Sequence, residues 1–255
     1  LSPSTGQWQY RPDEKALDSL HSGESTEDRL MLTSLDGSAQ QELVISLLGS
    51  DDMAIISGTS TGTLVEDGAD TTAYGDLDVT DPDHDQDKFA APQNGELVKA
   101  TTYGIQTPYG VFYFNQADGQ WNFEMEKGST AVQSLGEGKT AEASFNVKSI
   151  DGSAEQTVTV TITGVNDRAN FSGDTELRIM ADAKDPVEGA VSVKDDDANE
   201  ASFQVPAGTA LQGQYGTFTF NSLGSAGTWT YAVDARNPTV VALNGGKDGA
   251  PPDTL

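Results

Sequence analysis

The chain has 255 residues, of which 36% are hydrophobic, and its 40 acidic residues outnumber 14 basic ones to give a formal net charge of −26. This charge argues against nucleic acids and anionic membrane surfaces as partners, and it suits a protein that binds cations or is simply very soluble. Cysteine is absent, which excludes disulfides and thiol chemistry. We find no apolar run long enough for membrane insertion and no signal peptide, so we expect any export signal to lie outside this segment.

Residues 1–52 have the pattern of the second half of a β-rich repeat. Gly6–Tyr10, with aromatic residues two positions apart, predicts a short strand. Two further strands are predicted around Leu30 and Leu32 and over the run Leu43–Leu48.

A segment of this half-repeat recurs 115 positions later. Ser34–Asp52 and Ser149–Asp167 share an Asp-Gly turn signal, a run with apolar residues at every second position, and an acidic end. Such recurrence marks tandem domains, and the period suits one β-sandwich. We therefore expect the C-terminal half of a repeat over residues 1–52, a complete repeat over 53–167 and the N-terminal part of a third over 168–255.

Inside the complete repeat, Tyr109–Phe114, a turn over Asn115–Gly119 and the strand that begins near Trp121 predict a β-hairpin. Tyr215–Phe220 is the counterpart in the third repeat, and Ser129–Leu135 predicts a single helical turn between sheets. Side chains two apart on a strand share a face, which gives the expected core. Its predicted members are Phe112, Phe114, Trp121, Phe145, Val158, Val160 and Ile162.

One tryptophan per repeat occupies the same register, at Trp8, Trp121 and Trp229. This favours a core residue packed between two sheets over the alternative, a sugar-stacking platform. The first and third repeats lack strands that would close their sheets, so we expect them to be less well ordered than the middle. They are complementary halves of one domain, but we do not expect them to pair within one chain, because a whole sandwich separates them.

Five short patterns lie along the chain: Gly-x-Leu-x-Val-x-Asp-x-Asp, Tyr-Gly-x-Phe-x-Phe, Gly-x-Trp-x-aromatic, a turn-and-strand unit with Val-x-Val-x-Ile, and Gly-x-Asn-Asp. Together they cover essentially the whole chain and resemble the VCBS-type repeats of very large RTX-type bacterial surface adhesins. The resemblance implies an all-β fold of tandem Ig-like or cadherin-like β-sandwich repeats, one complete and two truncated.

The same resemblance implies a non-catalytic function. The repeats would form a Ca²⁺-stiffened spacer of a secreted protein, exported by type I secretion to the bacterial cell surface and acting in cell adhesion and biofilms. The partners would be neighbouring repeats of the same chain. The alternative is a module that binds surface polysaccharide or protein, for which the tyrosines Tyr103, Tyr109 and Tyr113 are a weak hint.

Acidic residues gather at the two joints between repeats. Ca²⁺ takes six to eight oxygen ligands, which two domain ends and their linker can supply together. The first joint offers Asp51, Asp52, Glu66, Asp67, Asp81, Asp83 and Asp85. The second offers Asn166, Asp167, Asp182, Asp195, Asp196 and Asp197. We expect Ca²⁺ at one joint or both; the alternative is that these segments are solvated turns. Ala181-Asp182 stands where the middle repeat has Glu66-Asp67, which weakens the second joint.

Two strings imitate functional motifs. Gly58–Gly62 spells a nucleophile elbow, but a β-type segment follows it and the chain has only two histidines. The string from Asp81 begins like an EF-hand loop, but Gln86 stands where the loop needs glycine and Pro92 where it needs glutamate. We therefore expect neither catalysis nor an EF-hand.

Overall fold

The computed structural model describes residues 5–204 and 208–245. By its internal contacts the chain divides into two compact units, Leu1–Ser129 with Thr140–Ile162, and Thr130–Lys139 with Thr163–Leu255. Nearly all regular structure is β-strand, as predicted. With six residues, α3 (Pro238–Leu243) is the longest described helix, and none of the described helices qualifies as a membrane span. We keep the names first, middle and third repeat for residues 1–52, 53–167 and 168–255.

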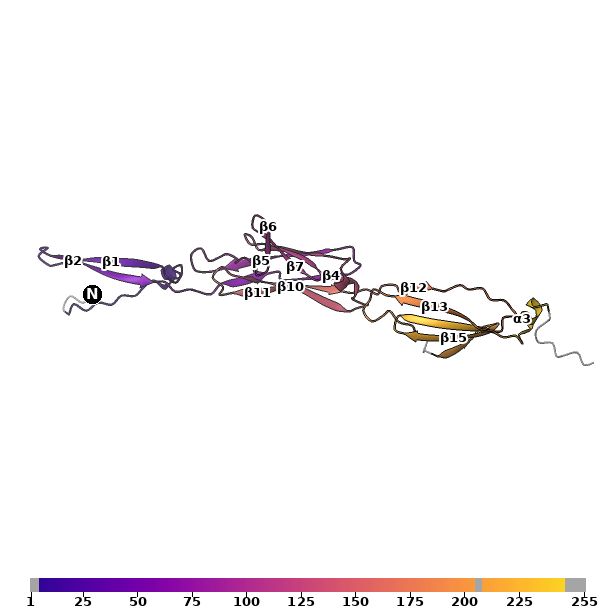
Figure 1. Ribbon diagram of the computed structural model, residues 1–255. Helices are drawn as coiled ribbons and strands as arrows, with labels where there is room; N and C mark the ends of the chain where they lie inside the picture. Colours follow the sequence, from indigo (N-terminus) through magenta and orange to yellow (C-terminus); the bar gives the residue numbers. More distant parts are fainter. Residues whose placement is uncertain (1–4, 205–207, 246–255) are drawn as a thin grey trace, which may run out of the picture. The chain divides into compact units, whose positions relative to one another are not determined.

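The first repeat is an antiparallel hairpin of β1 (Ser25–Thr33) and β2 (Gln40–Leu48), preceded by the short helix α1 (Glu14–Leu17) (Figure 1). At the turn, Asp36 accepts hydrogen bonds from the hydroxyls of Ser34 and Ser38 at 2.6 and 2.8 Å. Both strands were predicted and are confirmed.

The strand predicted over Gly6–Tyr10 is wrong, because these residues have no regular structure. Its counterpart in the middle repeat is β9 (Gln120–Met125), which lies between two neighbouring strands. The described part of the first repeat contains neither neighbour. A segment with the residue pattern of a strand does not form one unless neighbouring strands pair with it, because its backbone N–H and C=O groups otherwise make no inter-strand hydrogen bonds.

The middle repeat contains two sheets. One has the order β3-β5-β9-β8-β7-β6 and the other the order β10-β11-β4. Their bounds are β3 Ile55–Gly58, β4 Thr61–Val65, β5 Thr72–Thr80, β6 Glu96–Lys99, β7 Thr102–Thr107, β8 Gly110–Asn115, β10 Thr140–Lys148 and β11 Glu155–Thr163. The predicted hairpin is β8–β9, and the predicted helical turn is α2 (Thr130–Gln133), so both are confirmed.

The two sheets enclose an aromatic core. Phe145 of β10 lies across from the six-stranded sheet, with its ring centroid 4.8 Å from that of Phe112 and 5.8 Å from that of Phe114. All seven predicted core residues are buried, which confirms the predicted face of each strand. The Trp121 ring lies over Gly75, where an added Cβ would come within 2.7 Å of the ring, and its Nε1 donates to the Thr59 carbonyl at 2.7 Å.

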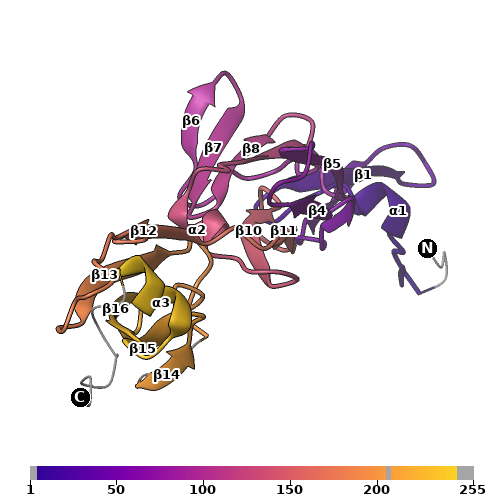
Figure 2. The same cartoon turned by 90° about the vertical axis from the view of Figure 1, so that its right-hand side faces the viewer.

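The third repeat has one five-stranded sheet, in the order β12-β13-β16-β15-β14 (Figure 2). Its strands are β12 Asn170–Gly173, β13 Val187–Lys194, β14 Thr209–Gln212, β15 Gly216–Leu223 and β16 Ala226–Val233. This order repeats β3-β5-β9-β8-β7 of the middle repeat. Across the described part of the third repeat, no second sheet faces it.

The predicted core position of the tryptophans is confirmed only where both layers exist. Trp121 is 2% exposed, Trp229 is half-buried and Trp8 is 52% exposed. For Trp8 the prediction is wrong, because the residues that pack around Trp121 belong to strands that the described first repeat lacks. The register of the tryptophan is therefore conserved along the chain, but its burial depends on the opposite sheet.

Candidate metal centre

The first joint is organised by the loop that follows β5. The backbone N–H of Asp83 donates to Asp81 Oδ1 at 2.9 Å, so the two side chains are held on one short turn. Asp83 Oδ2 in turn accepts from the backbone N–H of Asp52 in the linker at 2.7 Å. The N–H of His84 donates to the Ser19 carbonyl of the first repeat at 3.1 Å. The structure therefore brings Asp52, Asp81 and Asp83 together.

Three oxygen atoms in this loop are shielded from solvent and, among the described residues, have no hydrogen-bond partner. They are Asp81 Oδ2, Asp83 Oδ1 and Gln86 Oε1. A buried acceptor without a donor costs roughly 1–3 kcal/mol, and more when it is charged. Burial raises the pKa of the Asp81 carboxyl, and the negative charges of Asp151 and Asp83 act in the same direction. These oxygens have the chemistry that a hard cation satisfies.

The other residues predicted for this joint lie elsewhere or serve other contacts. Asp51 is exposed, and its Oδ1 accepts from the backbone N–H of Ser22 at 2.7 Å. Asp85 is also exposed and pairs with Lys88 at 3.1 Å, which lowers its pKa. Both side chains lie on the exposed surface of the joint, and of the two only Asp51 accepts a hydrogen bond from Ser22.

Glu66 and Asp67 are not brought to this group. They follow β4 in a turn where Gly68 N donates to the Val65 carbonyl, and this turn precedes β5. Asp81 comes after the end of β5, whose nine residues span about 30 Å. Glu66 is fully buried at its own end of the strand.

The second joint repeats the hydrogen-bond network of the first. Asp197 N donates to Asp195 Oδ1 at 3.0 Å, and Asp197 Oδ2 accepts from the backbone N–H of Asp167 at 2.8 Å. Ala198 N donates to the Ser134 carbonyl at 3.2 Å, as His84 does to Ser19. Asp197 is 2% exposed, and its Oδ1 has no hydrogen-bond partner within the described residues. The structure thus brings Asp167, Asp195 and Asp197 together.

The remaining residues predicted for the second joint are more peripheral. Asn166 is exposed, and its backbone N–H donates to Glu137 Oε2 at 3.2 Å. Asp196 faces solvent and pairs with Lys194 at 2.6 Å. Asp182 is exposed in the segment before β13, as Asp67 precedes β5.

Sequence reasoning missed Gln86 and Glu200, which occupy the same place in the two joints. Each lies three residues after the buried aspartate, and the residue before each has a left-handed backbone, with φ of 64° at Asp85 and 70° at Asn199. The Glu200 carboxylate packs against Gly136, where an added Cβ would lie 2.9 Å from Glu200 Oε1. The sequence did contain a signal for these two residues: a side chain with an oxygen atom follows each Asp-x-Asp pair at the same distance of three residues. As they stand, no three His, Asp or Glu side chains of the described chain form a ready-made metal cluster.

A second candidate site lies on the outer face of the six-stranded sheet. Tyr74, Asn122 and Tyr113 are direct neighbours across β5, β9 and β8, and Tyr74 is 78% exposed. They line a groove of about 640 Å³. The third repeat has Glu188 and Thr219 in place of the two tyrosines. Tyr74 was missed from sequence, because a single tyrosine on a strand does not reveal which face it occupies.

No protein-family model matches the sequence, and no curated protein matches it at a significant level. Among solved structures, protocadherin gamma B7 extracellular cadherin domains 1–4 match with 16% identity and a TM-score of 0.39, over 91% of this chain and 53% of that one. Protocadherin gamma B2 extracellular cadherin domains 1–5 match with 10% identity and a TM-score of 0.43, over 82% and 45%. The N-terminal eight Ig domains of the cell adhesion molecule DSCAM match with 12% identity and a TM-score of 0.27, over 84% and 34%.

The chain spans about half or less of the length of these structures. At such identities and TM-scores, its function has to be inferred from its own residues.

Proposed function

We propose that this chain is a non-catalytic spacer of a secreted bacterial surface adhesin, in which Ca²⁺ bound at the joints stiffens consecutive repeats. The observation that carries the proposal is the recurrence of one network at two joints. In both, an Asp-x-Asp turn holds the linker backbone and leaves a buried carboxylate oxygen without a hydrogen bond, on Asp83 and on Asp197. Solvated turns would not require buried, unpaired carboxylate oxygens at the same position twice.

The residues that would hold the ion at the first joint are Asp81, Asp83 and Gln86, with Asp51 and Asp52 from the linker. Bound Ca²⁺ supplies positive charge and coordination for the buried oxygens. Asp83 already fixes the linker by accepting from Asp52 N, and the contact of His84 N with the Ser19 carbonyl ties in the first repeat. Without a cation, the clustered carboxylates repel one another and loosen this attachment.

Ligand binding to the folded state alone stabilises it by about 2.7 kcal/mol at a hundredfold excess over the dissociation constant. The joint would accordingly be pliable where free Ca²⁺ is low and rigid outside the cell. This dependence suits a protein that is exported before it must bear load at the bacterial surface, in cell adhesion or a biofilm.

The test is a pair of melting curves, in Ca²⁺ and in chelator, together with calorimetric titration. We expect Ca²⁺ to raise the melting temperature of the wild-type chain. Asp83→Asn and Asp197→Asn should each reduce the rise and the heat of binding. Asp85→Asn is the matched control, because this exposed carboxylate pairs with Lys88, and it should leave both nearly intact. The proposal would be contradicted if Ca²⁺ raised the melting temperature of all three variants equally, or if it left the melting temperature of the wild type unchanged.

The groove beside Tyr74 favours a second function, binding of a surface polysaccharide or protein by the middle repeat. Exposed tyrosine rings beside amide side chains can stack on sugar rings while the amides bind hydroxyl groups. The test is glycan-array binding of the wild type against Tyr74→Ala and Tyr113→Thr. Tyr215→Ala, which removes an exposed tyrosine of the third repeat that does not line this groove, serves as the control. If no glycan binds the wild type, the polysaccharide form of this function fails.

A further inference from the structure

The groove beside Tyr74 holds a carboxylate as well as rings and amides. Asp76 lies two positions after Tyr74 on β5, so both side chains leave the same face of the sheet, about 7 Å apart along the strand. Asp76 is exposed and lines the groove with Tyr74 and Tyr113. None of the ion pairs in the described chain involves Asp76. The groove thus presents a negative charge beside its aromatic rings.

The surroundings of the groove are acidic rather than basic. Of the described residues that line it, none is lysine, arginine or histidine. Glu124 is exposed and lies two positions after Asn122, so it adds a second negative charge to this face of the sheet. On β6, the last strand of the sheet in its described part, Glu96 and Lys99 offset each other. An anionic ligand would therefore meet repulsion in the groove, without a cation to pair with.

The third repeat shows that the fold does not require these side chains. Its five strands follow the same order as their counterparts in the middle repeat, and the register of β16 with β13 and β15 identifies the matching positions. The counterparts of Asp76, Tyr74 and Tyr113 are, in the same order, Ala190, Glu188 and Thr219. A sheet of this architecture therefore forms without the carboxylate and without either tyrosine, so these side chains are not there to hold the sheet together.

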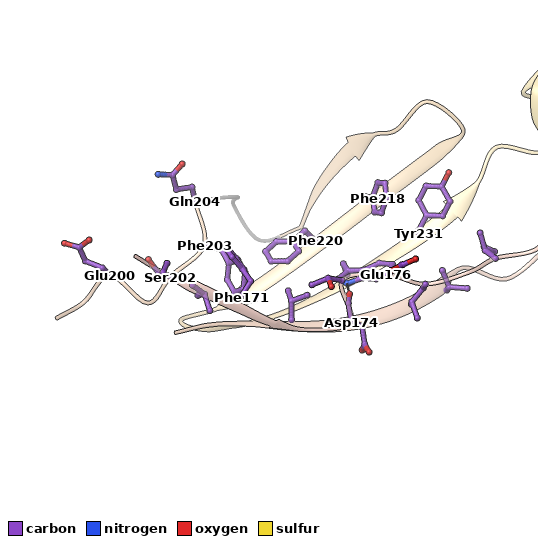
Figure 3. A pocket seen from close by; sticks show the side chains of 18 residues that line it. Phe171, Asp174, Glu176, Glu200, Ser202, Phe203, Gln204, Phe218, Phe220 and Tyr231 are labelled. Atoms are coloured by element: carbon purple, nitrogen blue, oxygen red, sulfur yellow. Dashed lines mark hydrogen bonds between the residues drawn. The ribbon is translucent and has the colours of Figure 1, made fainter. Parts of the chain in front are cut away.

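The third repeat has a groove of its own, but on the opposite face of its sheet. Figure 3 shows the rings of Phe218, Phe220 and Tyr231 in that groove. Phe218 and Phe220 stand in the register of Phe112 and Phe114, which are fully buried in the middle repeat. The groove of the third repeat is therefore the core face of a sheet. The groove beside Tyr74 lies on the solvent face and combines rings with polar groups, as ligand sites do.

The groups in the groove beside Tyr74 favour a ligand that is cationic and rich in hydroxyl groups. The face of an aromatic ring attracts a cation, and a carboxylate forms a charge-assisted hydrogen bond with an ammonium group. The side-chain amides of Asn122 and Gln120, which also line the groove, can bind hydroxyl groups. A sugar with an ammonium group uses all of these features. A neutral sugar would gain nothing from the charge of Asp76.

The spacing of the two tyrosines favours a chain of sugars over a single sugar. Tyr74 is on β5 and Tyr113 on β8, and β9 lies between them with Asn122 opposite both. Two strand spacings separate their backbones by about 10 Å. One sugar ring cannot stack on both tyrosines at this distance, so each tyrosine would contact a different unit of the ligand.

We propose that this groove binds a polysaccharide of amino sugars whose amines are free, with an ammonium group at Asp76 and sugar rings on Tyr74 and Tyr113. This inference rests on the second function proposed above, glycan binding by the middle repeat, and names its ligand class. Asp76 selects the charge of the ligand, while the tyrosines supply contacts that any pyranose chain shares.

The test is isothermal titration calorimetry of the full chain in Ca²⁺-free, mildly acidic buffer, where the sugar amines are charged. The probes are a glucosamine oligomer, the same oligomer with acetylated amines, and a galacturonate oligomer. The wild type should bind the free-amine oligomer about tenfold more tightly than the acetylated one. It should not bind the galacturonate oligomer measurably.

Three variants separate the roles of ring, carboxylate and overall charge. Tyr74→Ala leaves the charge unchanged and should weaken binding of the free-amine oligomer about tenfold. Asp76→Asn should bind the free-amine and acetylated oligomers about equally. Glu126→Gln is the charge-matched control, because this exposed carboxylate follows the far end of β9 and does not line the groove, and it should behave as the wild type.

A polycation could also bind simply because the chain has a net charge of −26. An oligolysine of the same charge should therefore bind the wild type about tenfold more weakly than the glucosamine oligomer, since it cannot stack on the tyrosines. Equal binding of oligolysine, or an equal loss in Glu126→Gln and Asp76→Asn, would overturn the proposal.

The remaining outcomes distinguish the ligand class from the function on which it rests. If the wild type binds the acetylated oligomer as tightly as the free-amine oligomer and Tyr74→Ala binds neither, the amino-sugar class is wrong and glycan binding stands. If the wild type binds none of the three oligomers, the proposed ligand is refuted, and the glycan array decides whether glycan binding fails with it.

Discussion

Replacement of Trp121 by alanine tests how the middle repeat is built. The side chain is 2% exposed, lies over Gly75 and donates to the Thr59 carbonyl at 2.7 Å. Removing a buried tryptophan costs about 3–5 kcal/mol, because apolar contacts are lost and a cavity remains. Trp8→Ala is the internal comparison: this side chain is 52% exposed, and its loss should cost less than about 1 kcal/mol. Trp229, half-buried on an open sheet, should fall between them.

Because the chain has more than one unit, the free energy should be measured locally, by native-state amide exchange of β8 and β9 for Trp121 and of β15 and β16 for Trp229. The order of losses should be Trp121, then Trp229, then Trp8. A loss below about 1 kcal/mol for Trp121→Ala would mean that the ring is not part of the core and would revive the sugar-platform alternative.

Three further outcomes are expected. The Ser34 and Ser38 hydroxyls lower the pKa of Asp36 to about 2. The carboxylate therefore stabilises its turn above about pH 4, and this stabilisation is lost as the pH falls through about 2. An Asp36 carboxyl resonance that titrates near 3.8 would contradict this. Gly75→Ala should destabilise the middle repeat by about 1–3 kcal/mol, since its Cβ would lie 2.7 Å from Trp121, while Gly128→Ala, with nothing within 4 Å, should not. Amide protection should be weaker in residues 5–52 than in the middle repeat; uniform protection across both would refute unpaired strand edges in residues 5–52.

Much of the fold followed from periodicity. The alternation over Ser149–Asp167 fixed both the strand and its buried face, and the Asp-Gly turn placed its hairpin. The strand predicted at Gly6–Tyr10 failed although its pattern matches that around Trp121. The alternation of residues within a segment predicts which face the segment would bury. Whether the segment forms a strand depends on pairing with other strands that are distant in sequence.

The candidate site was predicted in part. The Asp-x-Asp pair beginning at Asp81 and the linker residue Asp52 do meet, because β3 begins where its antiparallel partner β5 ends, with Ile55 opposite Thr80. Glu66 was grouped with them only by nearness in sequence, and the length of β5 separates it from Asp81. Gln86 was rejected as the wrong residue for an EF-hand loop, yet its side-chain amide oxygen Oε1 is buried in the loop. Backbone turns decide which side-chain oxygens come together, and these turns cannot be predicted from the number of acidic residues in a segment.

The stiffened joint is tested most directly by small-angle scattering of the chain in chelator and in millimolar Ca²⁺. Proposed binding at the joints predicts that Ca²⁺ narrows the distribution of the radius of gyration, and that Asp83→Asn weakens this effect while Asp85→Asn does not. An identical distribution with and without Ca²⁺, together with no heat of binding, would contradict the mechanism and leave the acidic clusters as solvated turns.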